Sequence, residues 1–468
     1  MAPRSPSPPP NPGVASASAD ATPDHDSPPS ADASTDDGRP PETTRRALLA
    51  AAGAVDVAAL AGCVDFRRST FGNEQVLPES EESAVGSGNR PGSWPMLQRD
   101  PGYAGAAPSA RGPTGNAAVA WTFETDEDPY RGFLPLAVAD GTLFAQSRHT
   151  LWAVDVADGA ERWRFAPPSL GGSGGQFLRS APAVGDGTVF VVGDVSLYAV
   201  DAGTGRAKWK YRTTSSFDDV LLAGNTAFFV CRSGADQSLV ALDAETGLTR
   251  WRRPADGSAY PLAYGDGSVF GATWRGPDDA ADGETGLWEV YAVDARTGEK
   301  RWSRRVTARA ETWFPTMAVA GGRIYVGTGP LYALDAKDGT VRWSALDDAD
   351  LTSASPVTDG ETVYVDADEP TRIVALDAAD GRRRWGERVS AGYALGHPSL
   401  VGDVLYVPLA SHDAGPGGVV GFDTTTGAER FRFVPPWSRA HGTSPPVVVD
   451  GTLYLGVGRT VYALEGDR

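Results

Sequence analysis

Cysteine is scarce in this chain, and the familiar catalytic motifs are missing. The 468 residues contain two cysteines, Cys63 and Cys231, too few for a disulfide framework or a multi-thiolate metal site within the chain. There is no G-x-S-x-G nucleophile elbow, no phosphate-binding Gly-Lys-Ser/Thr loop and no H-E-x-x-H helix. These absences exclude the common signatures of serine hydrolases, nucleotide-binding enzymes and zinc proteases. Cys231 follows an Ala-Phe-Phe-Val run and is predicted to be a small core residue.

Lysine is also rare, and positive charge is in deficit overall. Only four of the 42 basic residues are lysines, and 60 acidic residues bring the formal net charge to -18. An acidic, lysine-poor surface is typical of halophilic proteins and predicts a haloarchaeal source, although a genomic base bias also favours arginine over lysine. Nucleic acid is excluded as a partner, because binding it requires clustered positive charge on a basic domain.

Bulky apolar residues are almost absent from residues 1–43. Eleven of the 36 prolines fall within the first 41 positions, among serine, alanine and aspartate. Such a segment cannot bury enough apolar surface to offset the entropy lost on ordering. Residues 1–43 are therefore predicted to be a disordered extension.

Residues 44–63 are predicted to form an export signal. Arg45 and Arg46 precede a short apolar stretch that ends in Leu-Ala-Gly-Cys. The Thr-Arg-Arg-x-Leu-Leu pattern resembles a twin-arginine signal, and Leu-Ala-Gly-Cys resembles a lipobox in which Cys63 becomes the lipidated first residue of the mature protein. The alternative is a buried amphipathic helix that contains two arginines. Asp56 inside the apolar run departs from the usual signal.

The forty-four residues before Arg45 are long for a signal of this kind and raise the question of a downstream start codon. Cleavage at Cys63 would leave residues 64–92 as a flexible acidic tether between the membrane and the rest of the chain. The protein is then predicted to be exported and anchored to the outer face of the cytoplasmic membrane by lipid on Cys63. Lipid would be its only contact with the membrane.

A short motif recurs from residue 151 to the end of the chain. An apolar pair and an Asp are followed four residues later by Gly and four residues after that by an aromatic residue, at intervals of 41 to 51 residues. The Asp positions are 155, 201, 243, 294, 335, 377 and 423, with Glu465 in the eighth place. The aromatic residues are Trp163, Trp209, Trp251, Trp302, Trp343, Trp385 and Phe431. A fixed period of this size indicates a repeat architecture.

Each repeat predicts four strands. Pairs of apolar runs around a Gly-containing turn, as in Ser-Ala-Pro-Ala-Val-Gly-Asp-Gly-Thr-Val-Phe at 180–190, indicate a first hairpin, and the Asp-to-Gly turn indicates a second. Four strands per repeat without a helix predict a β-propeller with one blade per repeat. The repeated tryptophan is predicted to fill the wedge between the outer edges of neighbouring blades.

The number of repeats predicts an all-β, eight-bladed propeller of four-stranded antiparallel blades. Seven repeats are complete, and the eighth ends before its tryptophan strand. Residues 119–125 contain Trp121 and have no hairpin before them, so this strand is predicted to complete the last blade. Trp121 then joins the seven other aromatic residues as a blade-docking residue, and the ring has no free edge.

The repeat closely resembles that of the pyrroloquinoline quinone (PQQ)-binding-like propeller superfamily, and the segment 93–108 resembles the opening of many such chains. The resemblance covers residues 93–468 and implies the fold. The family includes quinoprotein dehydrogenases that hold PQQ with Ca²⁺, often beside a vicinal disulfide, and non-catalytic lipoproteins. This chain has no adjacent cysteines and no haem motif, and it lacks long insertions, so it resembles the non-catalytic lipoproteins more closely.

Residues just before each inner strand are predicted to surround the axis on the funnel face and to form the candidate ligand-binding set. They are Phe133, Arg179, Asp218, Tyr260, Trp313, Ser353, His397 and His441. A chemically mixed ring of this kind suits selective binding, and the alternative is a set of ordinary rim residues. His397 and His441 belong to consecutive repeats, but no third ligand at motif spacing supports a metal site.

Acidic clusters that begin near residues 126, 217 and 278 have two interpretations: they bind cations, or they are solvated loops.

Two functions remain compatible with these sequence features. The first is a non-catalytic binding or scaffolding propeller with no catalytic residue and no cofactor, whose protein partner or small ligand binds at the funnel. The second, implied by the family resemblance alone, is a PQQ- and calcium-dependent dehydrogenase of sugars or alcohols with Trp313 stacked on the quinone.

Overall fold

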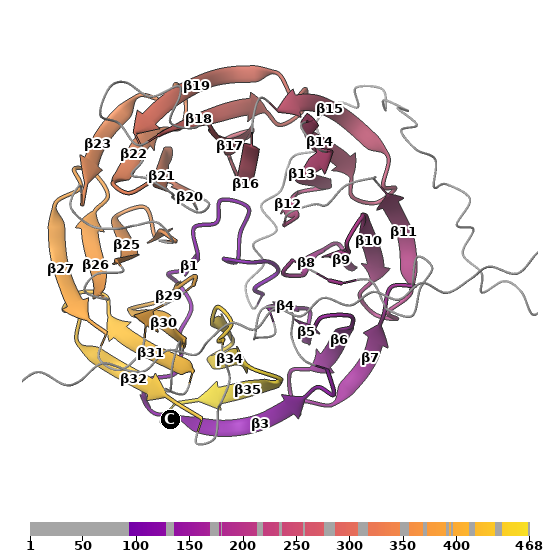
Figure 1. The fold of residues 1–468 in the computed structure, drawn as a ribbon. Helices are drawn as coiled ribbons and strands as arrows, with labels where there is room; N and C mark the ends of the chain where they lie inside the picture. The colour runs from indigo at the N-terminus through magenta and orange to yellow at the C-terminus, as the bar shows by residue number, and fades with distance from the viewer. Residues whose placement is uncertain are drawn as a thin grey trace, which may run out of the picture. The chain divides into compact units, whose positions relative to one another are not determined.

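The structure is a computed structural model, and its described residues belong to one compact unit, Cys63–Arg468. They are 93–127, 135–168, 177–178, 180–212, 219–233, 236–255, 258–275, 286–307, 317–346, 355–367, 372–389, 393–394, 396–410, 417–435 and 442–466. The predicted extension, export signal and tether lie outside this set, as do Arg45, Arg46 and Cys63. The described elements are all β-strands, arranged as the sheets of a propeller around a central axis (Figure 1).

Seven sheets have four antiparallel strands each. The first three contain β4 (Leu136–Ala139), β5 (Thr142–Gln146), β6 (Leu151–Asp155) and β7 (Glu161–Phe165); β8 (Ala183–Gly185), β9 (Thr188–Val192), β10 (Ser196–Asp201) and β11 (Ala207–Arg212); and β12 (Leu221–Ala223), β13 (Thr226–Ser233), β14 (Asp236–Asp243) and β15 (Thr249–Ala255).

The next three contain β16 (Ser258–Gly265), β17 (Ser268–Trp274), β18 (Leu287–Asp294) and β19 (Lys300–Thr307); β20 (Met317–Ala320), β21 (Arg323–Gly327), β22 (Leu331–Asp335) and β23 (Val341–Ala345); and β24 (Val357–Thr358), β25 (Thr362–Ala367), β26 (Arg372–Asp377) and β27 (Arg383–Arg388). The seventh combines β33 (Val447–Val449), β34 (Thr452–Val457) and β35 (Thr460–Glu465) with β3 (Ala118–Glu124).

The remaining sheet has seven strands, so the prediction of eight four-stranded blades is wrong: seven sheets match that description. Its inner four strands are β29 (Ser399–Val401), β30 (Val404–Ala410), β31 (Gly418–Asp423) and β32 (Glu429–Phe433), and β28 (Tyr393–Ala394) pairs with β30. Two strands from the start of the described chain add in parallel, β1 (Ala106–Ala107) on β29 and β2 (Gly115–Asn116) on β32. Two-residue strands carry no alternating pattern, so the repeat could not reveal them.

The first hairpin of several repeats turns through two residues in the left-handed region. Asp140 and Gly141 have φ values of 47° and 70°, and Asp186 and Gly187 have values of 45° and 67°. Positive φ at both central residues is the geometry that matches the twist of the flanking strands, and Asp-Gly is among the pairs that adopt it best. These turns place the innermost strand of each sheet toward the axis.

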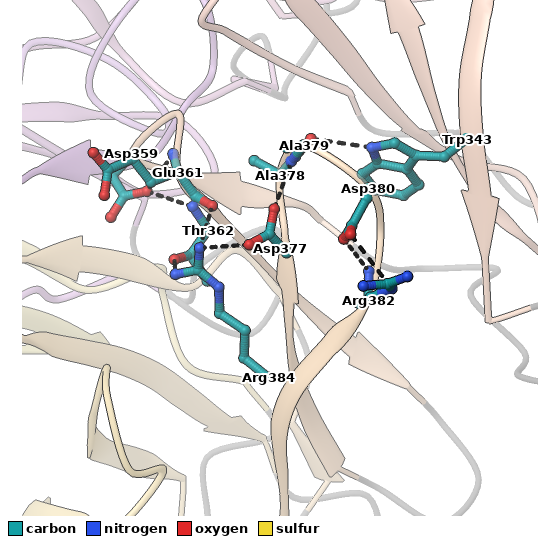
Figure 2. A network of polar contacts seen from close by, with 10 residues as sticks. All are labelled: Trp343, Asp359, Glu361, Thr362, Asp377, Ala378, Ala379, Asp380, Arg382 and Arg384. Atoms are coloured by element: carbon teal, nitrogen blue, oxygen red, sulfur yellow. Dashed lines mark hydrogen bonds and ion pairs between the residues drawn. The ribbon is translucent and has the colours of Figure 1, made fainter.

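The Asp of each repeat fixes the second turn and also holds a base on the outermost strand. In the repeat shown in Figure 2, Asp377 Oδ1 accepts from the Ala379 amide at 2.8 Å, and Asp377 Oδ2 lies 2.9 Å from Arg384 Nη2. The same Asp-to-base pair recurs in all seven repeats at 2.5 to 3.6 Å. The base always stands directly before the aromatic residue, a regularity that was not predicted from the sequence.

The repeated tryptophan joins each sheet to the next one. Trp343 on β23 donates from Nε1 to the carbonyl oxygen of Ala378 at 3.0 Å, across the boundary to the following sheet (Figure 2). Six other tryptophans make the equivalent bond at 2.7 to 3.1 Å, including Trp121. Each indole lies against the turn glycine of the next repeat, so closely that a Cβ there would come within 3 Å of the ring. This is the wedge-filling role predicted for these residues.

Ring closure uses both ends of the described chain. β3 pairs antiparallel with β35, with Trp121 opposite Ala463, so the pairing predicted for this strand is observed. Phe431 stands where a tryptophan would complete the pattern, and a phenyl ring has no N–H to donate. At this position β2 adds beside Phe431, and Tyr406 donates its hydroxyl to the carbonyl oxygen of Pro113 at 2.7 Å. Residues 106–116 thus reinforce the boundary that lacks an indole.

We expect Gly381→Ala to destabilise the protein more than Gly141→Ala. Both glycines have positive φ, 74° and 70°, so both variants carry similar backbone strain of about 1 kcal/mol. A Cβ at Gly381 would lie 2.7 Å from Trp343 Cε3, whereas one at Gly141 would meet nothing within 4 Å. The forced displacement of the indole should lower the free energy of unfolding by a further amount of about 1–3 kcal/mol. Urea unfolding measures the difference, and equal losses in both variants would contradict the docking role.

Candidate functional site

Most of the predicted funnel set lies outside the described residues. Phe133, Arg179, Asp218, Trp313, Ser353 and His441 belong to that undescribed part of the chain. The backbone of Tyr260 lies in β16, and only His397 has a described side chain. The proposed proximity of His397 and His441 therefore stays a prediction.

One continuous segment, residues 93–107, runs around the inside of the ring and is called the channel segment here. Figure 1 shows its indigo trace within the circle of sheets. Its carbonyl oxygens accept hydrogen bonds of 2.7 to 2.9 Å from the inner strands of six sheets. The donors are the amides of Val138, Val184, Tyr264, Val319, Thr358 and Leu400, and the acceptors are Trp94, Pro95, Pro101, Gly102, Ala104 and Gly105.

Close approach explains the glycine at position 102. A Cβ at Gly102 would lie 2.6 Å from the carbonyl oxygen of Val319, in β20. Larger side chains would push the channel segment away from this strand and break the bond from Val319. The backbone here is therefore held against the sheet in a way that only glycine permits.

Gln98 connects the channel segment to His397, the member of the predicted funnel set whose side chain is described. It is 3 % exposed and has a φ of 54°, a conformation unusual for a residue with a side chain. Its Nε2 lies 2.8 Å from Nδ1 of His397, just before β29. With the amide donating, Nδ1 accepts and a neutral imidazole carries its proton on Nε2. His397 thus serves at least in part to position the channel segment.

Two neighbouring charges in the channel segment have perturbed ionisation. Burial raises the pKa of Asp100 to about 6, opposed by the amide of Ala104 at 3.2 Å and by Arg99. Burial lowers the pKa of Arg99, opposed by Asp100. The Arg99 guanidinium donates to the carbonyl oxygen of Ala106 at 2.9 Å and lies 5.9 Å from the ring centre of Trp94.

Among the described residues, the ring of bonds to the channel segment is interrupted at β12 and again at β33, the inner strand of the last sheet. Val448 and Val449 of this strand face a cavity of about 630 Å³ between the channel segment and the ring. Arg99 and Arg111 also line it, and neither forms an ion pair with a carboxylate among the described residues. Asp450 also lines the cavity, so two guanidinium groups and one carboxylate surround it.

A second cavity, of about 270 Å³, lies between the sheets of β12–β15 and β16–β19. Glu289 in its wall is 8 % exposed and pairs with Arg275 and, at 3.6 Å, with Lys300. Burial would raise the pKa of Glu289, but hydrogen bonds from Ser303 and Arg275 hold it below its usual value. Tyr291 also lines the cavity, and its buried hydroxyl has no hydrogen-bond partner among the described residues.

Charged side chains line both cavities. The first contains Arg99, Arg111 and Asp450, and the second contains Glu289, whose lowered pKa keeps this carboxylate ionised at neutral pH. No group of three His, Cys, Asp or Glu side chains able to hold a metal ion occurs in the described part of the chain. None of the described elements is a helix able to cross a bilayer.

Neither the channel segment nor its cavity was predicted from the sequence. Backbone carbonyls make the bonds to six sheets, and an acceptor of this type depends little on the identity of the side chain. The two glycines at 102 and 105 within Asp-Pro-Gly-Tyr-Ala-Gly were the available sign of a backbone held close to its surroundings.

We expect Asp100→Asn to stabilise the protein at neutral pH. A carboxyl whose pKa is higher in the folded state than in the unfolded state binds more protons when folded, so stability falls as pH rises from about 4 to about 6. The variant should lose this pH dependence and gain about 1–2 kcal/mol at pH 7, since Asp100 is partly exposed and water screens part of the penalty. Chemical unfolding at pH 4 and pH 7 measures it. A variant that is less stable at both values would contradict this assignment.

Comparison with known proteins identifies the family. The family model described as outer membrane protein assembly factor BamB matches residues 113–260, 148–308 and 288–463. A search of curated protein sequences found no match.

Solved structures share the fold at low sequence identity. BamB from Moraxella catarrhalis is 20% identical with a TM-score of 0.55, covering 75% of this chain and 98% of that chain. Quinohemoprotein alcohol dehydrogenase from Comamonas testosteroni is 16% identical with a TM-score of 0.60, covering 81% of each chain. A europium-containing methanol dehydrogenase is 14% identical with a TM-score of 0.62, covering 79% of this chain and 90% of that chain. Because the family model matches most of the sequence, the chain belongs to the family of the outer membrane protein assembly factor BamB, with the PQQ-like β-propeller fold.

Proposed function

We propose that this protein is a non-catalytic binding or scaffolding propeller, exported and held at the outer face of the cytoplasmic membrane by lipid on Cys63. The observation that carries the proposal is the use made of the repeated residues. The Asp, the base and the aromatic residue of each repeat are engaged in turns and sheet boundaries, and none is left to act on a substrate. The repeat therefore supports a rigid surface for recognition.

The channel segment supports the same proposal. Its backbone is bonded to six inner strands, so the protein's own chain lies inside the ring. Bonds from inside the ring hold these inner strands at fixed spacing, which favours recognition of a partner by shape. The partner, a protein or a small ligand, would bind at the funnel face predicted from the connections between repeats.

The fold similarity to BamB from Moraxella catarrhalis is compatible with this proposal, and so is the export signal predicted at Arg45 and Arg46. A lipid on Cys63 followed by residues 64–92 would hold the propeller near the membrane while leaving its faces accessible. Quinoprotein dehydrogenases share the fold at similar TM-scores, so fold alone does not separate the two functions.

We expect Cys63→Ser to release the full-length protein from the membrane. The wild-type protein should fractionate with membranes and carry a lipid mass on an N-terminus that begins at Cys63. Cys231→Ser is the matched control, because Cys231 is a buried free thiol that should have no part in anchoring. Fractionation with mass spectrometry of the recovered N-terminus checks both. An unmodified wild-type N-terminus, or equal membrane association of the two variants, would refute anchoring through Cys63.

We expect no dehydrogenase activity when the purified protein is supplied with PQQ and Ca²⁺. Reduction of an artificial dye with glucose or ethanol should stay at the level of the protein-free control, and calorimetry should detect no binding at micromolar PQQ. Binding of PQQ together with dye reduction would replace the non-catalytic proposal with the dehydrogenase function.

A further inference from the structure

Three neighbouring outermost strands carry an unusual concentration of positive charge. β11, β15 and β19 belong to consecutive sheets and lie side by side along the rim of the ring (Figure 1). Together they contain ten lysines and arginines and no acidic residue. These three strands are called the basic arc here.

The basic arc contrasts with the rest of the rim and of the protein. The five other outermost strands, β3, β7, β23, β27 and β32, contain eight basic and four acidic residues. The whole chain has a formal net charge of -18. Three of its four lysines nevertheless lie in β11 and β19. The positive charge is thus gathered on one side of the rim.

Part of this charge is neutralised within the fold. Lys208, Arg250 and Arg301 each pair with the Asp of their own repeat, at 2.6 to 3.6 Å. These bases have the structural role seen in every repeat and are held close to the sheet. Lys300 pairs with Glu289 at 3.6 Å.

Three arginines of the arc have no carboxylate partner among the described residues. Arg212, Arg252 and Arg305 are exposed, one on each strand, and none forms an ion pair with a carboxylate among the described residues. Their positions on three adjacent strands place a row of guanidinium groups across the rim. Unpaired guanidinium groups on a surface attract phosphate, because the planar fork of donors fits phosphate oxygens.

We propose that the basic arc rests on an anionic lipid surface and orients the propeller with its rim against the membrane. A bilayer with anionic headgroups attracts bases at its surface by about 1 kcal/mol each. The proposal rests on the proposed anchoring through Cys63, and it adds a second contact to that lipid. The 29 residues of the tether, 64–92, would reach up to about 100 Å if extended, so the tether alone would leave the orientation of the propeller undetermined.

The test uses the full-length Cys63→Ser protein, which cannot carry the lipid, and vesicles of phosphatidylcholine with about 30 % phosphatidylglycerol. Flotation should show binding at about 0.1 M salt and loss of binding at about 1 M, where charges are screened beyond about 3 Å. Pure phosphatidylcholine vesicles should not bind. Replacing Arg212, Arg252 and Arg305 with Gln should weaken the partition coefficient by about 100-fold, from about 1 kcal/mol lost per base.

A matched triple variant supplies the control. Arg164→Gln, Arg388→Gln and Arg432→Gln change the net charge equally, on β7, β27 and β32, outside the basic arc. The match is in net charge, since Arg164 pairs with Glu161 and Arg432 with Glu429. This variant should keep at least most of the vesicle binding. Thermal unfolding of both variants checks that each one is folded. Equal weakening by the two triple variants would overturn the proposal, because total charge and not the arc would then control binding.

The outcomes also separate this proposal from anchoring by lipid. Absence of lipid on wild-type Cys63 with arc-dependent vesicle binding would reject the anchor and keep the arc as a membrane contact. A lipidated wild-type protein whose Cys63→Ser form binds no anionic vesicle would keep the anchor and overturn the membrane role of the arc. In that case an acidic protein surface would be the remaining partner for the arc.

Discussion

The contact between an indole and the turn of the next repeat is the interaction on which the whole ring depends. Neighbouring sheets of a propeller diverge toward the rim, and a gap there would expose apolar surface on both sheets. Trp343 fills the gap with a large flat side chain and also donates a hydrogen bond to Ala378. The turn glycine lets the ring approach without a clash. One side chain therefore buries apolar surface, makes a directional hydrogen bond and sets the distance between two sheets at the same boundary.

Charge is organised by the same repeat. Seven repeats place an Asp in the turn and a base on the outermost strand, so in seven of the sheets opposite charges are separated along the sheet and joined by one ion pair. Exposed pairs of this type contribute little to stability on their own. Their larger effect is on the surface, because bases collect at the rim while the acidic turns lie at the ends of the strands. A strongly acidic protein can thereby have a basic surface at part of its rim.

The propeller and its docking residues were predictable because they repeat. Asp, Gly and Trp recur at fixed offsets, and hairpins follow from local alternation and turn residues. The count of four-stranded blades was wrong because β1 and β2 are two-residue strands that pair in parallel with distant partners. Nothing in their own residues indicates that pairing.

The candidate site was less predictable for a related reason. The funnel set was taken from connections between repeats, which the motif does not define, and His397 alone has a described side chain. The contact of His397 with Gln98 joins residues 299 positions apart in the sequence, and no local sequence pattern predicts a contact between residues so far apart. The cavity beside Arg99 exists because the channel segment bonds to six inner strands and then stops short of β33.

The path from Trp94 to Gly105 also bears on how such a protein can evolve. It bonds to six inner strands in chain order and passes β12 without a bond, so its length is matched to the circumference of this ring. Gaining or losing one repeat by unequal recombination would change the circumference. The carbonyl oxygens of the channel segment would then no longer face the amides of the later inner strands. Open solenoids tolerate such changes because each unit meets only its neighbours. Here the number of repeats and the segment inside them have to be inherited together.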